Sequence, residues 1–244
     1  MFNTKKEKKI KKTKVSRETN YKVVVIGGGH AGCEAAAAAA RIGSPTLLIT
    51  NNKSKIGEMS CNPSIGGLGK GHLVKEIDSL DGIIGKAIDM SGIQFRVLNA
   101  SKGPAVRGLR AQADRNLYKK AINNLLTKEK NLDIIEEEVT DLDITNKSIS
   151  GVVLSKKTIV PCETVVLTTG TFLNGLIHIG NKKIPAGRIG EKATYGLSKT
   201  FKKYGFKLGR MKTGTPPRIA KKSINFKKLT KQNSDRKITP FSFM

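Results

Sequence analysis

The clearest pattern of apolar positions begins at residue 22. A run of β-branched residues over 23–26 predicts a strand that is buried on both faces. Three glycines follow in the spacing G-x-G-x-x-G, and the alanine run after them predicts a closely packed helix. A second apolar run, 46–49, predicts another buried strand. This order of strand, glycine-rich turn, helix and strand is typical of a β-α-β unit that binds a dinucleotide.

Each glycine of the turn has a physical task in such a unit. Gly27 allows the tight turn out of the strand, Gly29 lets a pyrophosphate approach the backbone, and Gly32 lets the helix pack on the sheet. The N–H groups and dipole of the helix point at the same place and favour an anion. The acidic residue expected about 20 positions further on is absent, because the second strand ends in Thr50-Asn51-Asn52.

The remaining pattern alternates loops, helices and strands. A glycine-rich stretch at 57–71 predicts a long loop, because five glycines and a proline disfavour a regular element. A second loop is predicted at 94–107, where basic side chains gather. The further predicted elements are helices at 71–88 and 109–129, a β meander at 134–139, 142–144 and 149–154, a buried strand at 164–171 that ends in Thr-Gly-Thr, and a short helix at 195–204.

Three cysteines lie far apart in the chain: Cys33, Cys61 and Cys162. Their spacing predicts neither a disulfide framework nor a metal site. Cys61 lies in the middle of the glycine-rich loop, where backbone N–H groups and a nearby cation would favour its thiolate. It is therefore a candidate for chemistry, whereas the alternative is a small buried side chain.

The formal net charge of +26 is concentrated at the two ends of the chain. Residues 1–22 contain 9 basic and 2 acidic side chains, and residues 199–244 contain 14 and 1. Such ends suit a polyanion such as RNA, although solvated lysines are the simpler interpretation. Residues 1–20 read as a disordered basic tail without a secretory signal, and organellar targeting is the less favoured interpretation. No segment has the length and apolarity of a membrane span.

These patterns divide the chain into a tail at 1–20, a nucleotide-binding domain at 21–175 and the start of an inserted, incomplete domain at 176–244. Five motifs carry a resemblance to one family: GGGHAG, MSCNPSIGGLGKGHLVKEID, GIQFRVLNASKGPAVRGLRAQADR, VVLTTGTFL and GRMKTGTPPRI. From about Tyr21 to Met244 the sequence resembles the MnmG (GidA) family. That family modifies the wobble uridine of tRNA.

The resemblance implies an α/β fold, a Rossmann-like FAD-binding domain of the two-dinucleotide-binding-domain flavoprotein type, with a β meander. It implies FAD as cofactor, with NADH and methylenetetrahydrofolate as substrates of the full enzyme. It implies tRNA, the GTPase MnmE and a second copy of the chain as partners, in the bacterial cytoplasm. The positions that match the family's FAD-binding residues are Gly27, Gly28, Gly29, His30, Ala31, Gly32, Val139 and Thr194.

The family's first essential cysteine falls on Cys61. Its basic side chains near the active site fall on Arg96, Lys102, Arg107 and Arg110. The family pattern extends several hundred residues further, so the expected fold is C-terminally truncated relative to it. Three functions are therefore compared: the FAD-binding part of a tRNA-modifying enzyme, an inactive remnant, and a nucleotide- or RNA-binding module without catalysis.

Overall fold

The computed structural model describes residues 20–244, and the chain folds as two compact units. The first unit comprises the chain up to Gly57 and residues 122–208, and the second comprises residues 58–121 and 209–244. The predicted tail at 1–20 lies outside the described residues apart from Asn20. The domain boundary predicted at residue 175 stays a prediction.

A six-stranded sheet forms the centre of the first unit, in the order β6-β2-β1-β9-β8-β7. Its strands are β1 Tyr21–Ile26, β2 Thr46–Thr50, β6 Leu132–Glu136, β7 Val139–Thr145, β8 Ser148–Leu154 and β9 Ile159–Leu167. Strands β6, β2, β1 and β9 are parallel, and β7 and β8 extend the sheet as an antiparallel meander. The parallel order, in which the third strand lies beside the second and the fourth beside the first, is that of doubly wound dinucleotide-binding folds. The α/β class is thus confirmed. A β meander is present, but it consists of β7, β8 and β9, whereas the first strand predicted for it, 134–139, largely corresponds to β6, which is parallel to β2.

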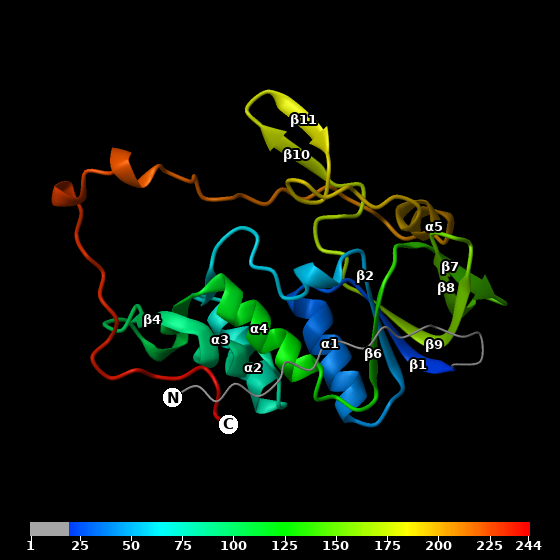
Figure 1. Cartoon of the computed structure of the whole chain (residues 1–244), viewed down its shortest axis with the longest axis horizontal. Helices are drawn as coiled ribbons and strands as arrows, with labels where there is room; N and C mark the ends of the chain where they lie inside the picture. Colours follow the sequence, from blue (N-terminus) through cyan, green and yellow to red (C-terminus); the bar gives the residue numbers. More distant parts are fainter. Residues whose placement is uncertain (1–19) are drawn as a thin grey trace. The chain divides into compact units, whose positions relative to one another are not determined.

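Helix α1 (His30–Arg41) packs on β1 and β2 (Figure 1). Its packed face consists of Cys33, Ala36, Ala37 and Ala40, none more than 1% exposed. Small side chains let the helix axis approach the sheet, and the apolar strands beneath supply the hydrophobic stabilisation. Helix α5 (Leu197–Lys203) contacts β7. Smaller elements complete the unit: the 3₁₀ turn η1 (Lys53–Lys55) and the hairpin of β10 (Leu176–Ile179) and β11 (Lys182–Pro185).

The second unit is built on a three-stranded antiparallel sheet in the order β3-β5-β4. Its elements are β3 Ser64–Gly66, α2 Lys70–Ser79, α3 Ile84–Ser91, β4 Gly92–Leu98, η2 Pro104–Val106, β5 Gly108–Ala113, η3 Lys221–Ser223 and η4 Phe226–Lys228. Helix α4 (Arg115–Leu126) begins in this unit and crosses into the first after Ala121. Apolar side chains of the sheet and helices, including Ile65, Ile88 and Ala111, are fully buried.

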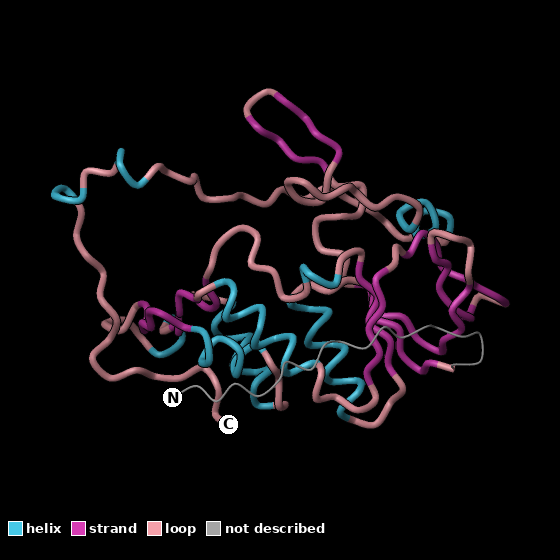
Figure 2. Tube along the Cα trace, viewed as in Figure 1, coloured by secondary structure: helices cyan, strands magenta, loops and turns pink. Residues whose placement is uncertain are grey.

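The C-terminal segment, residues 231–244, lies along the edge of β4 and then on α2 and α3. Figure 2 shows it as loop throughout. Backbone atoms of Phe95 and Val97 hydrogen-bond with Ser234 and Asp235, which covers the strand edge. Phe241 is fully buried, and its N–H donates to Asp89 Oδ1 at 2.9 Å. The segment is therefore an integral part of the packing of this unit.

Two predicted helices are wrong in the second unit. The helix predicted at 71–88 is interrupted after Leu80, because Asp81 has φ 66° and a side chain at Gly82 would meet Ile77 at 2.4 Å. The result is two helices, α2 and α3. The helix predicted at 109–129 begins only at Arg115, since the preceding residues form β5.

Two predicted loops also contain strands. The glycine-rich loop at 57–71 includes β3, whose Ile65 is fully buried opposite Ala111. The basic loop at 94–107 begins with most of β4, which pairs with β5 through Leu98. In both stretches the strand is stabilised by a partner distant in sequence, which a local pattern does not contain.

Substitution of the anchoring aromatic residue tests the role of the C-terminal segment. We expect Phe241→Ala to lower the free energy of unfolding by about 3–5 kcal/mol, because it empties a fully buried site. The matched control is Phe243→Ala, whose ring is 70% exposed and contacts the Lys75 amine at 4.0 Å, with an expected loss of about 1 kcal/mol or less. Urea denaturation measures both. Equal losses would show that the segment is not anchored through Phe241.

Candidate functional site

The turn after β1 meets the end of β9. Thr168 donates from its backbone N–H to Ile26 O at 2.9 Å, and from its hydroxyl to Ile26 O at 2.8 Å and Gly27 O at 3.1 Å. Strand order reverses between β1 and β9, so this turn lies at the carboxyl ends of the strands at a topological switch point. In open α/β sheets this is the place where ligands bind.

The glycines of the turn differ in what surrounds them. A Cβ on Gly32 would lie 1.8 Å from Gly27 O, and one on Gly27 would lie 2.5 Å from Thr168 O. These two glycines are therefore required for the turn itself. A Cβ on Gly29, in contrast, would meet nothing within 4 Å. Open space beside the second glycine is what the approach of a pyrophosphate requires.

The N-terminus of α1 faces this turn. Its N-cap is Gly29, which has no side chain to accept hydrogen bonds from the first-turn N–H groups, and the first turn contains no acidic residue. Backbone N–H donors and the helix dipole thus favour a bound anion. Together with the space beside Gly29, this fits the diphosphate of FAD. Of the predicted residues, Gly27, Gly28 and Gly29 form this turn, and His30, Ala31 and Gly32 form the first turn of α1.

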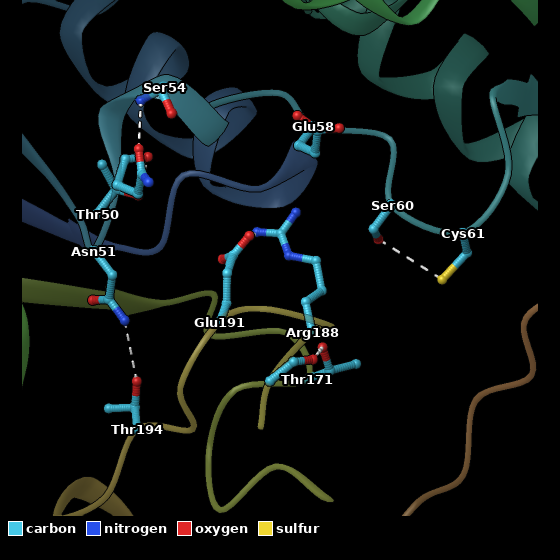
Figure 3. A network of polar contacts seen from close by, with 12 residues as sticks. Thr50, Asn51, Ser54, Glu58, Ser60, Cys61, Thr171, Arg188, Glu191 and Thr194 are labelled. Atoms are coloured by element: carbon cyan, nitrogen blue, oxygen red, sulfur yellow. Dashed lines mark hydrogen bonds and ion pairs between the residues drawn. The ribbon is translucent and has the colours of Figure 1, made fainter. Parts of the chain in front are cut away.

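The two other predicted FAD positions lie around the carboxyl end of β2. The amide of Asn51 donates to Thr194 Oγ1 at 3.3 Å (Figure 3). Val139 lies near the end of β2, because Glu137, two residues before it, donates its N–H to Thr50 O. The side chain of Val139 is only 2% exposed and belongs to the core. A ligand at this position would meet the backbone of Val139. Thr194 and Asn51 can hydrogen-bond a ribose where the usual acidic residue is missing.

Asn52 has a local structural task. Its Oδ1 accepts the N–H of Ser54 at 2.8 Å and thereby caps η1. Of the three polar residues that end β2, only Asn51 is directed to Thr194. The sequence alone did not distinguish which of these three residues would be available to a ribose.

Cys61 lies in the second unit and is exposed to solvent. The hydroxyl of Thr215 donates to its Sγ at 3.6 Å, and Arg218 donates to the Ser60 carbonyl at 3.1 Å. Figure 3 shows the Ser60 hydroxyl beside the same sulfur, at 3.7 Å. Thr215 and Arg218 belong to the motif GRMKTGTPPRI, and its contact with Cys61 was not predicted, since 154 residues separate Thr215 from Cys61.

Lys70 is the cation of the glycine-rich loop that carries Cys61, and its amine has a partner elsewhere. The Lys70 amine donates to Ser64 O at 3.4 Å, and burial lowers the pKa of Lys70 below its ordinary value. The other two cysteines are buried. Burial raises the pKa of Cys33 to about 12 and that of Cys162 to about 11. Exposure therefore distinguishes Cys61 from the other thiols.

The four predicted basic residues gather on one hairpin of the second unit. Arg96 in β4 lies directly opposite Arg110 in β5, and Lys102 and Arg107 flank the connecting turn. Arg107 donates to Lys102 O at 3.1 Å. The prediction that these side chains cluster is thus supported by strand register, although Arg96 and Arg110 lie in strands and only Lys102 and Arg107 lie in a loop.

Two properties concern the described part of the chain as a whole. Between residues 20 and 244, no helix combines the length and apolarity needed to cross a bilayer. Over the same residues, no three His, Cys, Asp or Glu side chains come together as metal ligands would.

Comparison with known proteins gives close relatives of this chain. Over 225 residues it is 54% identical to the tRNA uridine 5-carboxymethylaminomethyl modification enzyme MnmG of Granulibacter bethesdensis, covering 91% of this chain and 36% of that protein. Two crystal forms of Aquifex aeolicus GidA are 49% and 48% identical, with TM-scores of 0.87 and 0.88, and cover 92% of this chain and 37% of theirs. A GidA-related protein from Thermus thermophilus, 20% identical with a TM-score of 0.56, shares the fold.

The chain thus spans little more than a third of the length of its MnmG relative and of the Aquifex GidA chains. The family model described as "Glucose inhibited division protein A" matches residues 22–244. That match includes both units and all five sequence motifs. The chain therefore belongs to the GidA family and corresponds to its N-terminal, Rossmann-like part.

Proposed function

We propose that this chain supplies the FAD-binding part of an enzyme that modifies C5 of the tRNA wobble uridine. The observation that carries the proposal is the turn after β1, where only Gly29 faces open space and the N-terminus of α1 offers its N–H groups. The 54% identical relative named as a tRNA uridine 5-carboxymethylaminomethyl modification enzyme supports the choice of reaction.

Residues of the first unit would hold the cofactor. The Gly27–Gly32 turn binds the diphosphate through backbone N–H groups, because no side chain intrudes beside Gly29. Asn51 and Thr194 hydrogen-bond the adenosine ribose, and the backbone at Val139 contacts the adenosine end. FAD, when bound, supplies the redox chemistry of the reaction.

Residues of the second unit would supply the thiol chemistry. Cys61 acts as nucleophile or redox thiol, since its sulfur is exposed and accepts a hydrogen bond from Thr215. Arg218 holds the Ser60 carbonyl and so orients the loop that carries the thiol. A donor at the sulfur favours the thiolate, which is the attacking form.

The partners of the proposed reaction follow from the family resemblance. The full enzyme would use methylenetetrahydrofolate as carbon source and NADH as reductant, act with the GTPase MnmE, and form a homodimer in the bacterial cytoplasm. Its substrate is tRNA, in keeping with the basic hairpin around Arg96 and Arg110.

A second candidate is a nucleotide- or RNA-binding module without catalysis, or an inactive remnant. The match covers 36% of the MnmG relative, so the activity of the whole protein is a proposal for this chain and this alternative is tested beside it. FAD binding, thiol reactivity and uridine modification separate the candidates. A binding module without catalysis would bind FAD or RNA. Under that alternative, Cys61→Ser in a complete enzyme would leave uridine modification unchanged.

Substitution of the second glycine tests the cofactor site. We expect Gly29→Val to fold normally, because a Cβ there meets nothing within 4 Å, and to weaken FAD binding at least about tenfold, because it occupies the diphosphate position. Titration of flavin fluorescence measures the affinity, and circular dichroism checks the fold. The matched control, Gly209→Val, also places its side chain in open space and should bind FAD like the wild type. Unchanged affinity in Gly29→Val would contradict the proposed site.

Thiol labelling tests the special position of Cys61. With limiting iodoacetamide at pH 8, we expect Cys61 to be alkylated at least about tenfold faster than Cys33 or Cys162, whose thiols are buried and have raised pKa values. Since those two pKa values are about 12 and 11, raising the pH to 9 should not remove the difference while the fold persists. Peptide mass spectrometry reads out each site.

The control for labelling is the denatured chain, in which the three rates should converge. Equal labelling rates of the three thiols in the folded chain would contradict the claim that exposure makes Cys61 the most reactive. In cells that depend on a complete enzyme, Cys61→Ser should abolish uridine modification while FAD stays bound. Normally modified tRNA from that variant would reduce Cys61 to a packing residue.

A further inference from the structure

We propose that the cross-strand pair Arg96 and Arg110 grips one phosphate group of an RNA strand. The choice of RNA rests on the proposed function, whereas the phosphate site itself rests on the geometry and charge of the β4–β5 hairpin. The pair lies entirely within the second unit.

Strand register places the two guanidinium groups on one face. Arg96 lies opposite Arg110, and two residues along the strands Gln94 lies opposite Gln112 on the same face. Phe95 and Ala111, the pair between them, point to the other face, where Ala111 is fully buried. The face with the arginines is therefore the polar face of this sheet, on which Arg96 and Arg110 are half-buried.

Two like charges directly opposite each other destabilise an antiparallel pair. Within residues 20–244, neither arginine forms an ion pair with a carboxylate of the chain. The hairpin from residue 92 to 113 contains four basic residues and no acidic one. A bound oxyanion would convert this repulsion into two favourable charge-assisted contacts.

The carboxylates nearest in sequence are engaged with the backbone. Asp89 accepts the N–H groups of Phe241 and Ser242, and Asp114 accepts the first N–H groups of α4. Asp235, beside β4, accepts the Val97 N–H at 2.7 Å. The local carboxylates thus stabilise the fold, and an anion for the arginine pair comes from outside the chain.

Arg96 is already positioned to receive such an anion. Its Nη1 donates to Asn233 O of the C-terminal segment at 3.1 Å, which fixes the guanidinium. A guanidinium has five N–H donors, so one bond to a carbonyl leaves a fork for a phosphate. The C-terminal segment therefore orients a binding side chain as well as covering the strand edge.

The surroundings favour a polyanion over a small phosphorylated molecule. Lys102 and Arg107, at the turn of the same hairpin, are exposed. Residues 209–244 of this unit add ten Lys and Arg side chains against the single carboxylate of Asp235. A high density of cations in one unit suits a chain of phosphates, and each neutralised phosphate adds to affinity by counterion release.

Binding of a fluorescent single-stranded RNA oligonucleotide across a salt series tests the proposal. We expect Arg96→Gln and Arg110→Gln each to weaken binding about tenfold and to reduce the log–log salt slope by about 0.7, the value for one phosphate on a single strand. Because both side chains share one phosphate, the double variant should lose the same slope as either single variant. The control Lys156→Gln removes one charge from an exposed residue of the first unit and should change the affinity less than twofold.

Three results would overturn the proposal: unchanged affinity in both arginine variants, an equal loss in Lys156→Gln, or a double variant that loses twice the slope. Thermal unfolding checks that the variants fold, and removal of like-charge repulsion should leave the melting temperature of Arg110→Gln at or above that of the wild type. FAD titration of the same variants keeps the two hypotheses separate. If the arginine variants lose RNA binding as expected but the wild type does not bind FAD, the proposed function is contradicted and the phosphate site is supported.

Discussion

The close approach of the turn after β1 to the end of β9 is the constraint on which the first unit depends. Gly27, Gly32 and Thr168 meet at distances that allow no Cβ on either glycine, and the Thr168 hydroxyl closes the contact with two hydrogen bonds. This contact fixes where α1 begins, and α1 then packs its alanine face on β1 and β2. One steric constraint thus aligns a helix N-terminus, an open position at Gly29 and the switch point of the sheet.

The second unit depends on contacts between segments that are distant in sequence. The C-terminal segment covers the edge of β4, buries Phe241 and directs the Arg96 guanidinium, while the loop at 212–218 reaches Cys61. Packing and chemistry are therefore linked in this unit, since the residues that stabilise it also position its basic and thiol side chains. A change in the C-terminal segment should affect binding as well as stability.

The sequence predicted the first unit well because its signals are local. The G-x-G-x-x-G spacing, the alanine run and the two apolar runs each lie within thirty residues of one another. The second unit was predicted poorly, because Leu109 and Ala113 also fit a helical spacing, and only their pairing with β4 places them in a strand. The pairing of Arg96 with Arg110 and the contact of Thr215 with Cys61 depend on register and long-range packing, which local periodicity does not encode.

Hydrogen–deuterium exchange with and without FAD tests the central claim most directly, because it reports on individual backbone N–H groups. The account predicts that FAD slows exchange most strongly in peptides covering residues 27–33, where the N-terminus of α1 would donate to the diphosphate. A weaker effect is expected at residues 50–52, the carboxyl end of β2. Saturating FAD that binds without protecting residues 27–33 would contradict the assignment of this turn as the dinucleotide site.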